Sequence, residues 1–290
     1  MLGASDLDIK FHESWQEDHR SHFLSQLLLF EVTRKKVVVQ YDGGGFSDRH
    51  HTMISVVKKL FELGLLRTSK KFYVFTGDNR PGGIDFDHAY FSISGKRNDH
   101  ELIVPDPYNF SWKYIGANSY DEFRKEIFEN SQKNTSKVIK KAYWRGSTGE
   151  HFSREELVKK ADGNSFLNCL KATSSDNNFE SLSQCGKYSA LIDLPGRGWS
   201  ARLKYLIASL RPIVVYPRHE WDWASMRLEP GIHYVLSLPS IDDLIQKCEM
   251  IIENSHAQNF YINSSSQIIN QISEANATLS FASIINKQAD

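Results

Sequence analysis

The chain has 290 residues, of which 40% are hydrophobic, 24% charged and 12% aromatic. This composition excludes a disordered or fibrous protein, and the length allows one large or two modest domains. Because 35 basic residues balance 35 acidic ones, no net charge attracts nucleic acid or an anionic membrane, and any anion site must come from locally clustered cations.

The cysteines and the first apolar run bear on the compartment. Cys169, Cys185 and Cys248 are an odd number without metal-ligand spacing, which favours a reducing compartment and predicts three buried thiols. The apolar residues 27–30 are too few for a signal peptide or a membrane span. We therefore expect a cytoplasmic protein without a transmembrane segment.

A strand, a glycine-rich loop and a helix come first in the N-terminal half. Residues 37–41 are mostly β-branched and apolar, three glycines follow at 43–45, and residues 50–66 have a helical spacing of apolar side chains. Further strands are expected at 71–76 and 90–94.

The middle of the chain contains a helix and then a polar linker. Ser119 followed by Glu122 is typical of a capping box, which predicts a helix over 119–131. The polar residues 130–136 form the candidate linker between two domains. After it, we expect strands at 141–144, 188–194, 212–216 and 232–236, and helices at 153–161, 199–210 and 240–254.

Helix N-caps and the C-terminal segment complete the predictions for the second half. Ser153 and Ser240 are the expected N-caps of the first and last of these helices. A serine-rich loop at 264–266 and a weak amphipathic helix over 268–285 are expected after them.

Strands that alternate with helices of about 10 to 15 residues indicate parallel sheets joined by right-handed crossovers. We therefore predict an α/β fold of two Rossmann-like domains, residues 1–135 and 136–290. The last helix is a candidate to pack back on the N-terminal domain.

The loop after the strand at 188–194 combines small residues with two arginines. Small residues allow a phosphate to approach the backbone, and Arg197 and Arg202 can grip its oxygens in bidentate fashion. The pattern is equally typical of the start of a helix with two surface arginines. The candidate anion-binding residues of this segment are Arg197, Gly198, Trp199, Ser200, Ala201 and Arg202.

A second loop of the same kind follows the strand at 141–144. It contains Arg145, Gly146 and Ser147, and Arg154 lies just inside the next helix. These residues form a second candidate anion cradle, although an Arg-Gly-Ser tripeptide is more often an ordinary turn. The chain lacks Gly-Lys-Ser/Thr at the required spacing here, which excludes a P-loop.

Two candidate carboxylate sites lie in the first half. Asp78 follows the strand at 71–76, where a Rossmann-like domain presents a general base, and its alternative role is that of a turn-forming aspartate. Asp85 and Asp87 form an Asp-x-Asp pattern that can hold a divalent metal ion. Residues 6–8 repeat the pattern, which shows how easily it arises by chance.

An aromatic loop lies between the two halves. Tyr108, Phe110 and Trp112 can stack on a sugar ring or an acceptor, and this is their candidate role. The alternative is that the loop packs between domains.

The segment 188–235 resembles the signature region of glycosyltransferase family 90. That family includes fungal capsule-associated xylosyltransferases, lipopolysaccharide-modifying bacterial proteins and animal protein O-glucosyltransferases. Upstream, residues 142–148 are similar to the family's Phe-Arg-Gly-Ser motif, and residues 102–112 to its apolar-Pro-Asp-aromatic-x-Phe-x-Trp segment. Residues 72–78 resemble the strand that ends in the family's catalytic aspartate.

The resemblance implies a GT-B-like fold, in which two Rossmann-type domains face each other across a cleft. It also implies a UDP-sugar donor, no metal or other cofactor, and inversion at the anomeric carbon. Asp78 would be the catalytic base, and Glu220 would lie near the ribose. The residues that would bind the donor are Arg145, Gly146, Ser147, Arg154, Arg197, Gly198, Trp199, Ser200, Ala201, Arg202 and Glu220.

The expected function is therefore the transfer of xylose or glucose from a UDP-sugar to a hydroxyl of a glycan, a lipopolysaccharide or a glycoprotein. A bacterial or viral enzyme acting in the cytoplasm fits the absence of a signal peptide. One alternative is a metal-dependent GT-A transferase that uses Asp85 and Asp87. The other is a catalytically silent glycan- or nucleotide-binding module, because Asn79 and Arg80 stand where the family has an aromatic residue and a proline after its aspartate.

Overall fold

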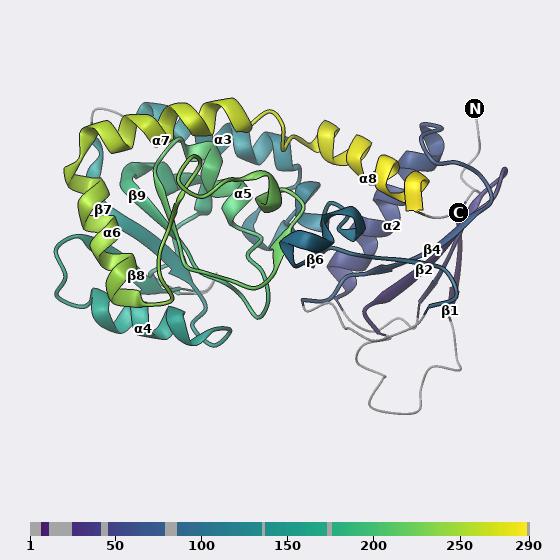
Figure 1. Cartoon of the computed structure of the whole chain (residues 1–290), viewed down its shortest axis with the longest axis horizontal. Helices are drawn as coiled ribbons and strands as arrows, with labels where there is room; N and C mark the ends of the chain where they lie inside the picture. Colours follow the sequence, from purple (N-terminus) through teal and green to yellow (C-terminus); the bar gives the residue numbers. More distant parts are fainter. Residues whose placement is uncertain are drawn as a thin grey trace. The chain divides into compact units, whose positions relative to one another are not determined.

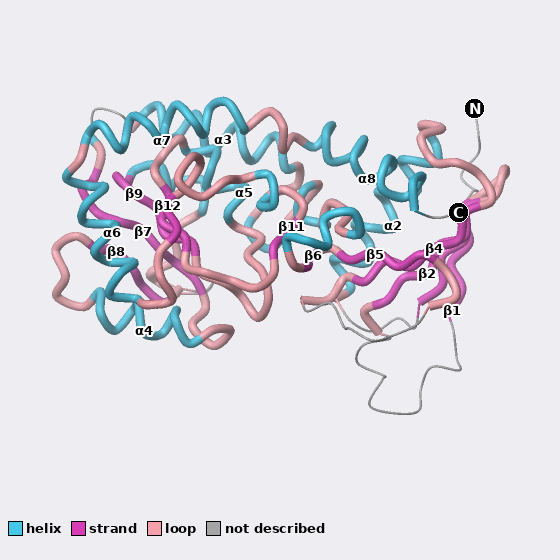
Figure 2. Tube along the Cα trace, in the orientation of Figure 1, coloured by secondary structure: helices cyan, strands magenta, loops and turns pink. Residues whose placement is uncertain are grey.

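The computed structural model describes residues 7–11, 25–41, 46–78, 86–134, 137–172 and 176–288, and the remaining residues are grey in Figure 2. The chain divides into two compact units. Unit 1 contains Met1–Ser111 and Glu274–Asp290, and unit 2 contains Trp112–Ser273. Each unit is built on its own five-stranded sheet with helices, as the predicted α/β class requires.

The sheet of unit 1 mixes parallel and antiparallel strands. β2 runs antiparallel to its neighbours β3 and β4, whereas β1 with β3 and β4 with β5 are parallel. The order is β1 (Leu7–Phe11), β3 (Val37–Tyr41), β2 (Leu27–Val32), β4 (Lys70–Phe75) and β5 (Ala89–Ser92). A tight turn reverses the chain, because the Thr33 N–H donates to the Lys36 carbonyl at 2.9 Å and makes β2 and β3 a hairpin. The expectation of parallel strands alone is therefore wrong for the first half.

Two helices from distant parts of the sequence pack in unit 1. α2 (Ser47–Glu62) and α8 (Glu274–Gln288) both bury apolar side chains, Leu60 and Phe281 among them. The amide of Asn286 in α8 donates at 2.8 Å to a backbone carbonyl in the loop after α2. Figure 1 shows α8 beside α2, so the last helix belongs to unit 1. The unit also contains β6 (Ser94–Gly95), η2 (Arg97–Leu102) and η3 (Pro107–Asn109).

The sheet of unit 2 is parallel throughout, as the alternation of strands and helices predicts. Its order is β12 (Val235–Leu236), β10 (Ile213–Val215), β9 (Tyr188–Asp193), β7 (Ile139–Gly146) and β8 (Leu167–Lys171). The unit also contains β11 (Trp221–Asp222), η4 (Lys113–Ile115), η6 (Leu182–Lys187) and η8 (Ser225–Arg227).

Helices cover both faces of this sheet. α4 (Phe152–Ala161) and α6 (Ile241–Glu253) pack on one face, where their apolar side chains surround the buried Trp144. α3 (Tyr120–Lys133) and α7 (Ser255–Ile268) lie on the other side (Figure 1). Burial on both faces explains why the central strands β9 and β10 are buried along their whole length.

The segment 199–210 is not one helix, contrary to the sequence-based expectation. Residues 196–202 form a loop, and the helix begins only at α5 (Leu203–Leu206), which continues into η7 (Ile207–Ser209). Of the small residues that suggested a helix start, Ser200 instead forms side-chain hydrogen bonds that hold the loop.

Two other local predictions are wrong. His151, not Ser153, is the N-cap of α4, because its Nδ1 accepts from the Ser153 N–H at 3.3 Å. The serines at 264–266 lie within α7, where Ser266 satisfies its hydroxyl by donating to the carbonyl of Asn263 at 2.7 Å. The predicted caps Ser119 and Ser240 are confirmed.

The boundary between the units lies earlier than the predicted linker. The first segment of unit 1 ends at Ser111, so α3 belongs to unit 2. Residues 135 and 136 of the linker lie outside the described residues. The three cysteines are buried and free, as predicted.

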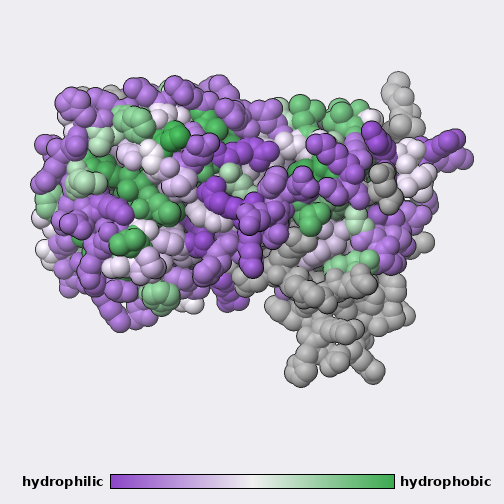
Figure 3. Space-filling model, in the orientation of Figure 1, coloured by the Kyte–Doolittle hydropathy of each residue, from purple (hydrophilic) through white to green (hydrophobic). Residues whose placement is uncertain are grey.

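Helix length and surface hydropathy bear on whether the chain contacts a membrane. In the described part of the chain, no helix is long and apolar enough to cross a bilayer. The face shown in Figure 3 is mostly hydrophilic, with apolar residues in separate patches.

Candidate active site

The carboxyl ends of β7 and β9 form a topological switch point in unit 2. The chain passes from β7 to β8 on one side and then returns to β9 on the other, so the loops after β7 and β9 run in opposite directions. Open α/β sheets bind ligands in the crevice at such a point. Both segments that the sequence predicted as anion cradles, 145–154 and 196–202, lie here.

Arg154 joins these two loops. It lies in the first turn of α4, and its side chain is buried. Nε donates to the Pro195 carbonyl at 2.8 Å, and Nη1 donates to the Ser147 carbonyl and to Glu150 Oε2, both at 3.0 Å. Burial and the charge of Arg202 lower the pKa of Arg154 to about 10. The folded protein therefore holds this guanidinium at an electrostatic cost.

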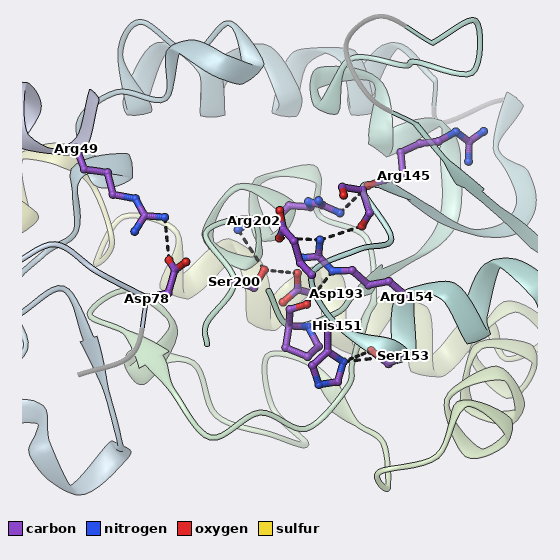
Figure 4. A network of polar contacts seen from close by, with 12 residues as sticks. Arg49, Asp78, Arg145, His151, Ser153, Arg154, Asp193, Ser200 and Arg202 are labelled. Carbon is purple, nitrogen blue, oxygen red and sulfur yellow. Dashed lines mark hydrogen bonds and ion pairs between the residues drawn. The ribbon is translucent and has the colours of Figure 1, made fainter. Parts of the chain in front are cut away.

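Two arginine side chains lie near the ring of Trp144. The guanidinium carbons of Arg154 and Arg202 are 6.0 and 5.8 Å from the centre of its ring. Nη1 of Arg202 donates to the Arg145 carbonyl at 2.7 Å, as Figure 4 shows. Two like charges held around one ring favour an anion with several oxygens, because that anion offsets their repulsion and can accept from both.

A buried carboxylate fixes the 196–202 loop. Asp193, the last residue of β9, accepts from Ser200 Oγ at 2.7 Å through Oδ1 and pairs with Arg218 through Oδ2. Ser200 Oγ in turn accepts from the Arg202 N–H at 3.3 Å. The hydroxyl proton of Ser200 is thus used inside the protein, and this serine positions Arg202.

The other residues of this loop differ in exposure. The Gly196 N–H donates to the Trp199 carbonyl at 2.9 Å, and a Cβ on Gly196 would lie 2.8 Å from the same oxygen, so this position requires glycine. Trp199 is buried, and Gly198 and Ala201 are half-buried. Arg197 is exposed and has no hydrogen-bond or ion-pair partner among the described residues.

The side chain of Arg145 points away from Arg154 and Arg202 (Figure 4). Its Nη1 and Nη2 donate to the backbone carbonyl and to Oδ1 of Asn168, both at 2.7 Å, and its guanidinium lies 5.0 Å from the ring centre of Tyr143. Arg145 therefore connects β7 to β8.

An aromatic pocket lies beside this arginine, entirely within unit 2. It has a volume of about 90 Å³ and reaches the carboxyl ends of β7 and β8. Arg145, Arg202 and Glu180 contribute its polar groups. The aromatic rings of its wall, which can stack on a planar ligand, are those of Trp112, Tyr114, Tyr143 and Phe179.

The residues predicted to bind an acceptor are divided between the two units. Trp112 lines the aromatic pocket of unit 2, whereas Tyr108 and Phe110 belong to unit 1 and are buried. Glu220 lies half-buried, directly before β11.

Asp78 lies just beyond the end of β4 in unit 1. Its Oδ1 is 2.9 Å from Nη2 of Arg49, and its side chain is 22% exposed. Its Oδ2 has no hydrogen-bond or ion-pair partner among the described residues. A carboxylate with one anchored oxygen and one open oxygen can accept a proton.

The rival carboxylate pair is only partly described. Asp85 lies outside the described residues, and Asp87 accepts from the Tyr73 hydroxyl at 3.0 Å and lies 3.3 Å from Nε2 of His88. Within the described ranges, no group of three or more His, Cys, Asp or Glu side chains is placed to hold a metal ion.

Four residues of this region are absent from the sequence-based set: Asp193, Arg49 and His151 contact predicted residues, and Arg218 pairs with Asp193. Asp193 ends a predicted strand, which is a weak signal, and Arg49 and Arg218 carry none, because only the fold brings them to their carboxylates. His151 accepts through Nδ1 from Ser153, which requires an unprotonated Nδ1, and burial together with the charge of Arg154 lowers its pKa. The other three residues act through ion pairs.

The two serines of the site are expected to differ in their effect on stability. Ser200→Ala leaves Asp193 Oδ1 and the Arg202 N–H without their partner, so the free energy of unfolding should fall by about 1–3 kcal/mol. The Ser147 hydroxyl has no partner among the described residues, and Ser147→Ala should change it by less than about 0.5 kcal/mol. Urea denaturation measures both, and equal losses would contradict the positioning role of Ser200.

The chain was compared with known protein families and proteins. The family model described as "Glycosyl transferase family 90" matches residues 78–282. No curated protein matches the chain. The matched range begins at Asp78 and includes both arginine-bearing loops, but it leaves out α2 and Arg49.

Proposed function

The chain belongs to glycosyl transferase family 90 and is therefore a glycosyltransferase, and from this premise we propose that it moves a sugar from a UDP-sugar to an acceptor hydroxyl, with inversion and without a metal ion. The proposal includes a GT-B-like arrangement, because the candidate base belongs to unit 1 and the candidate donor loops belong to unit 2.

The observation that carries the proposal is the pair of arginines around Trp144. A departing diphosphate gains negative charge, and Arg154 and Arg202 supply two positive groups at the switch point, where such ligands bind. The neighbouring aromatic pocket offers rings on which the nucleobase of the same donor can stack.

The proposed reaction is a single displacement. The acceptor hydroxyl gives its proton to Oδ2 of Asp78 as its oxygen forms a bond to the anomeric carbon. The bond between that carbon and the phosphate oxygen breaks, and its electron pair leaves with UDP. Arg154 and Arg202 stabilise the negative charge that develops on the diphosphate. Attack from the face opposite UDP inverts the anomeric carbon.

We expect the reaction to proceed without a divalent metal, because the two arginines neutralise the diphosphate. UDP release from the donor should therefore be unchanged by EDTA. A loss of activity that Mg²⁺ or Mn²⁺ restores would favour the alternative GT-A reaction through Asp85 and Asp87. The bonds of Asp87 to Tyr73 and His88 leave it less available for that role.

The donor is proposed to be UDP-xylose or UDP-glucose, and the acceptor a glycan, a lipopolysaccharide or a glycoprotein in the cytoplasm. A thermal-shift panel tests the donor: a ligand at 100 times its dissociation constant adds about 2.7 kcal/mol to the stability of the folded state. UDP-glucose and UDP-xylose should raise the melting temperature, and GDP-mannose should not. No shift with any UDP-sugar would overturn the proposal. A shift without any UDP release would favour the silent binding module.

A further inference from the structure

Arg49 lies at the centre of a buried polar cluster in unit 1. It projects from α2, outside the range that the family model matches, and its side chain is 10% exposed. A buried guanidinium is costly unless its donors are satisfied, so the partners of this one indicate what it is for.

Each of the three nitrogens of the Arg49 guanidinium has a polar partner. Nε donates to the Tyr108 hydroxyl at 3.0 Å, and Nη1 donates to the Thr76 carbonyl at 2.8 Å. Nη2 lies 2.9 Å from Oδ1 of Asp78, and Figure 4 shows this ion pair. The partner at Thr76 follows β4 directly, so Arg49 binds both the end of that strand and the carboxylate beyond it.

Two aromatic rings, those of Phe46 and Tyr108, hold Arg49 in this position. The guanidinium lies 4.0 Å from the ring centre of Phe46 and 5.6 Å from that of Tyr108. Tyr108 is itself fixed, because its backbone N–H donates to Oδ1 of the fully buried Asp106 at 2.9 Å. The aromatic loop, which the sequence suggested for an acceptor, thus fixes an arginine through Tyr108.

We propose that Arg49 is a positioning residue for the catalytic base: it anchors Oδ1 of Asp78 so that Oδ2 faces the incoming hydroxyl. This rests on the proposed function, in which Asp78 is the base. A proton acceptor misplaced by about 1 Å can cost on the order of 10²-fold in rate, so the anchor matters for turnover and not for donor binding.

The charged groups around the ion pair support this assignment. Among the described residues, Arg49 from α2 forms the ion pair with the carboxylate of Asp78, and Ser94 from β6 donates to its backbone carbonyl at 3.3 Å. Burial raises the pKa of Tyr108 overall, although the charge and hydrogen bond of Arg49 lower it, so the Tyr108 hydroxyl stays protonated. Burial alone would lower the pKa of Arg49, but Tyr108 and Asp78 raise it overall, so the cation persists.

The test compares Arg49→Met, Arg49→Lys and the matched control Arg67→Met, whose side chain is exposed in the same unit. The readouts are the dissociation constant of UDP and the kcat for UDP release from UDP-glucose or UDP-xylose. Arg49→Met should lower kcat by about 10²-fold with UDP binding unchanged. Arg49→Lys should lower kcat by less, because it retains the positive charge but not the planar guanidinium. Arg67→Met should match the wild type.

The outcomes separate this inference from the function on which it rests. If Asp78→Asn is inactive while Arg49→Met keeps the wild-type kcat, the positioning role is wrong and the proposed base stands. If Asp78→Asn is fully active, the proposed base itself fails. If Arg49→Met also loses UDP binding, that variant has lost its fold, and Arg49→Lys decides. A wild-type kcat of Arg49→Lys overturns the inference. A lower kcat of Arg49→Lys with intact UDP binding supports it.

Discussion

Replacing Asp78 with asparagine is expected to lower turnover by ~10²–10⁴-fold, the usual contribution of a general base. The amide has nearly the same shape, and its oxygen can still accept from Nη2 of Arg49, so the surrounding fold should persist. It cannot take the proton of the acceptor. Because Asp78 belongs to unit 1 and the arginine loops to unit 2, the dissociation constant of UDP should stay within about twofold. Initial rates of UDP release and calorimetric titration with UDP measure the two quantities.

Asp87→Asn is the matched control for this prediction. Asp87 lies in the same unit, shortly before β5, but its side chain is 69% exposed and already bonded to Tyr73. Its replacement should leave turnover unchanged. An inactive Asp87→Asn beside an active Asp78→Asn would reverse the assignment and favour the metal-dependent reaction.

Arg202→Ala is expected to weaken UDP binding by about 2 kcal/mol, or roughly 30-fold, the usual loss of a charge-assisted hydrogen bond. The substitution removes one of the two cations beside Trp144 and the bond to the Arg145 carbonyl. Arg154 would remain, held by the Pro195 and Ser147 carbonyls, so the site should still bind UDP weakly. Calorimetric titration at constant ionic strength measures the loss.

Arg197→Ala tests whether position within the loop matters. Arg197 lies five residues before Arg202 in the same loop but is exposed, so water and salt screen its charge, and it should contribute less than about 1 kcal/mol to binding. Equal losses for the two alanine variants would mean that the diphosphate binds at the exposed edge of the loop rather than beside Trp144.

The parallel half of the fold was predictable because its local signals agree with one another. β9 and β10 are short apolar runs, and the helices over Ser119 and Ser240 begin with capping residues, so strand, cap and helix all indicate the same alternation. The mixed sheet of unit 1 was not predictable, because the residues of β2 form only a brief apolar run in the sequence. Its direction depends on a four-residue turn whose effect on the sheet appears only when β3 pairs with it.

The sequence predicted which residue types the structure brings together after β7 and β9, but not the contacts that these residues make. Glycines, serines and arginines after two strands identified both loops, but the sequence does not show which hydroxyl is already bonded. Ser200 is committed to Asp193, and the bond to that buried carboxylate holds the residues before α5 as a loop instead of a helical turn. Long-range partners such as Arg218 have no sequence signal, because twenty-five residues separate it from the carboxylate it neutralises.

The path of the chain sets an order of assembly during synthesis. Unit 2 is one uninterrupted stretch, whereas unit 1 needs α8, whose residues leave the ribosome only after all of unit 2. The nascent protein can therefore complete the half with the arginine loops while the half with Asp78 still lacks a helix. Vectorial folding of this kind would complete the proposed donor site before the unit that carries the proposed base.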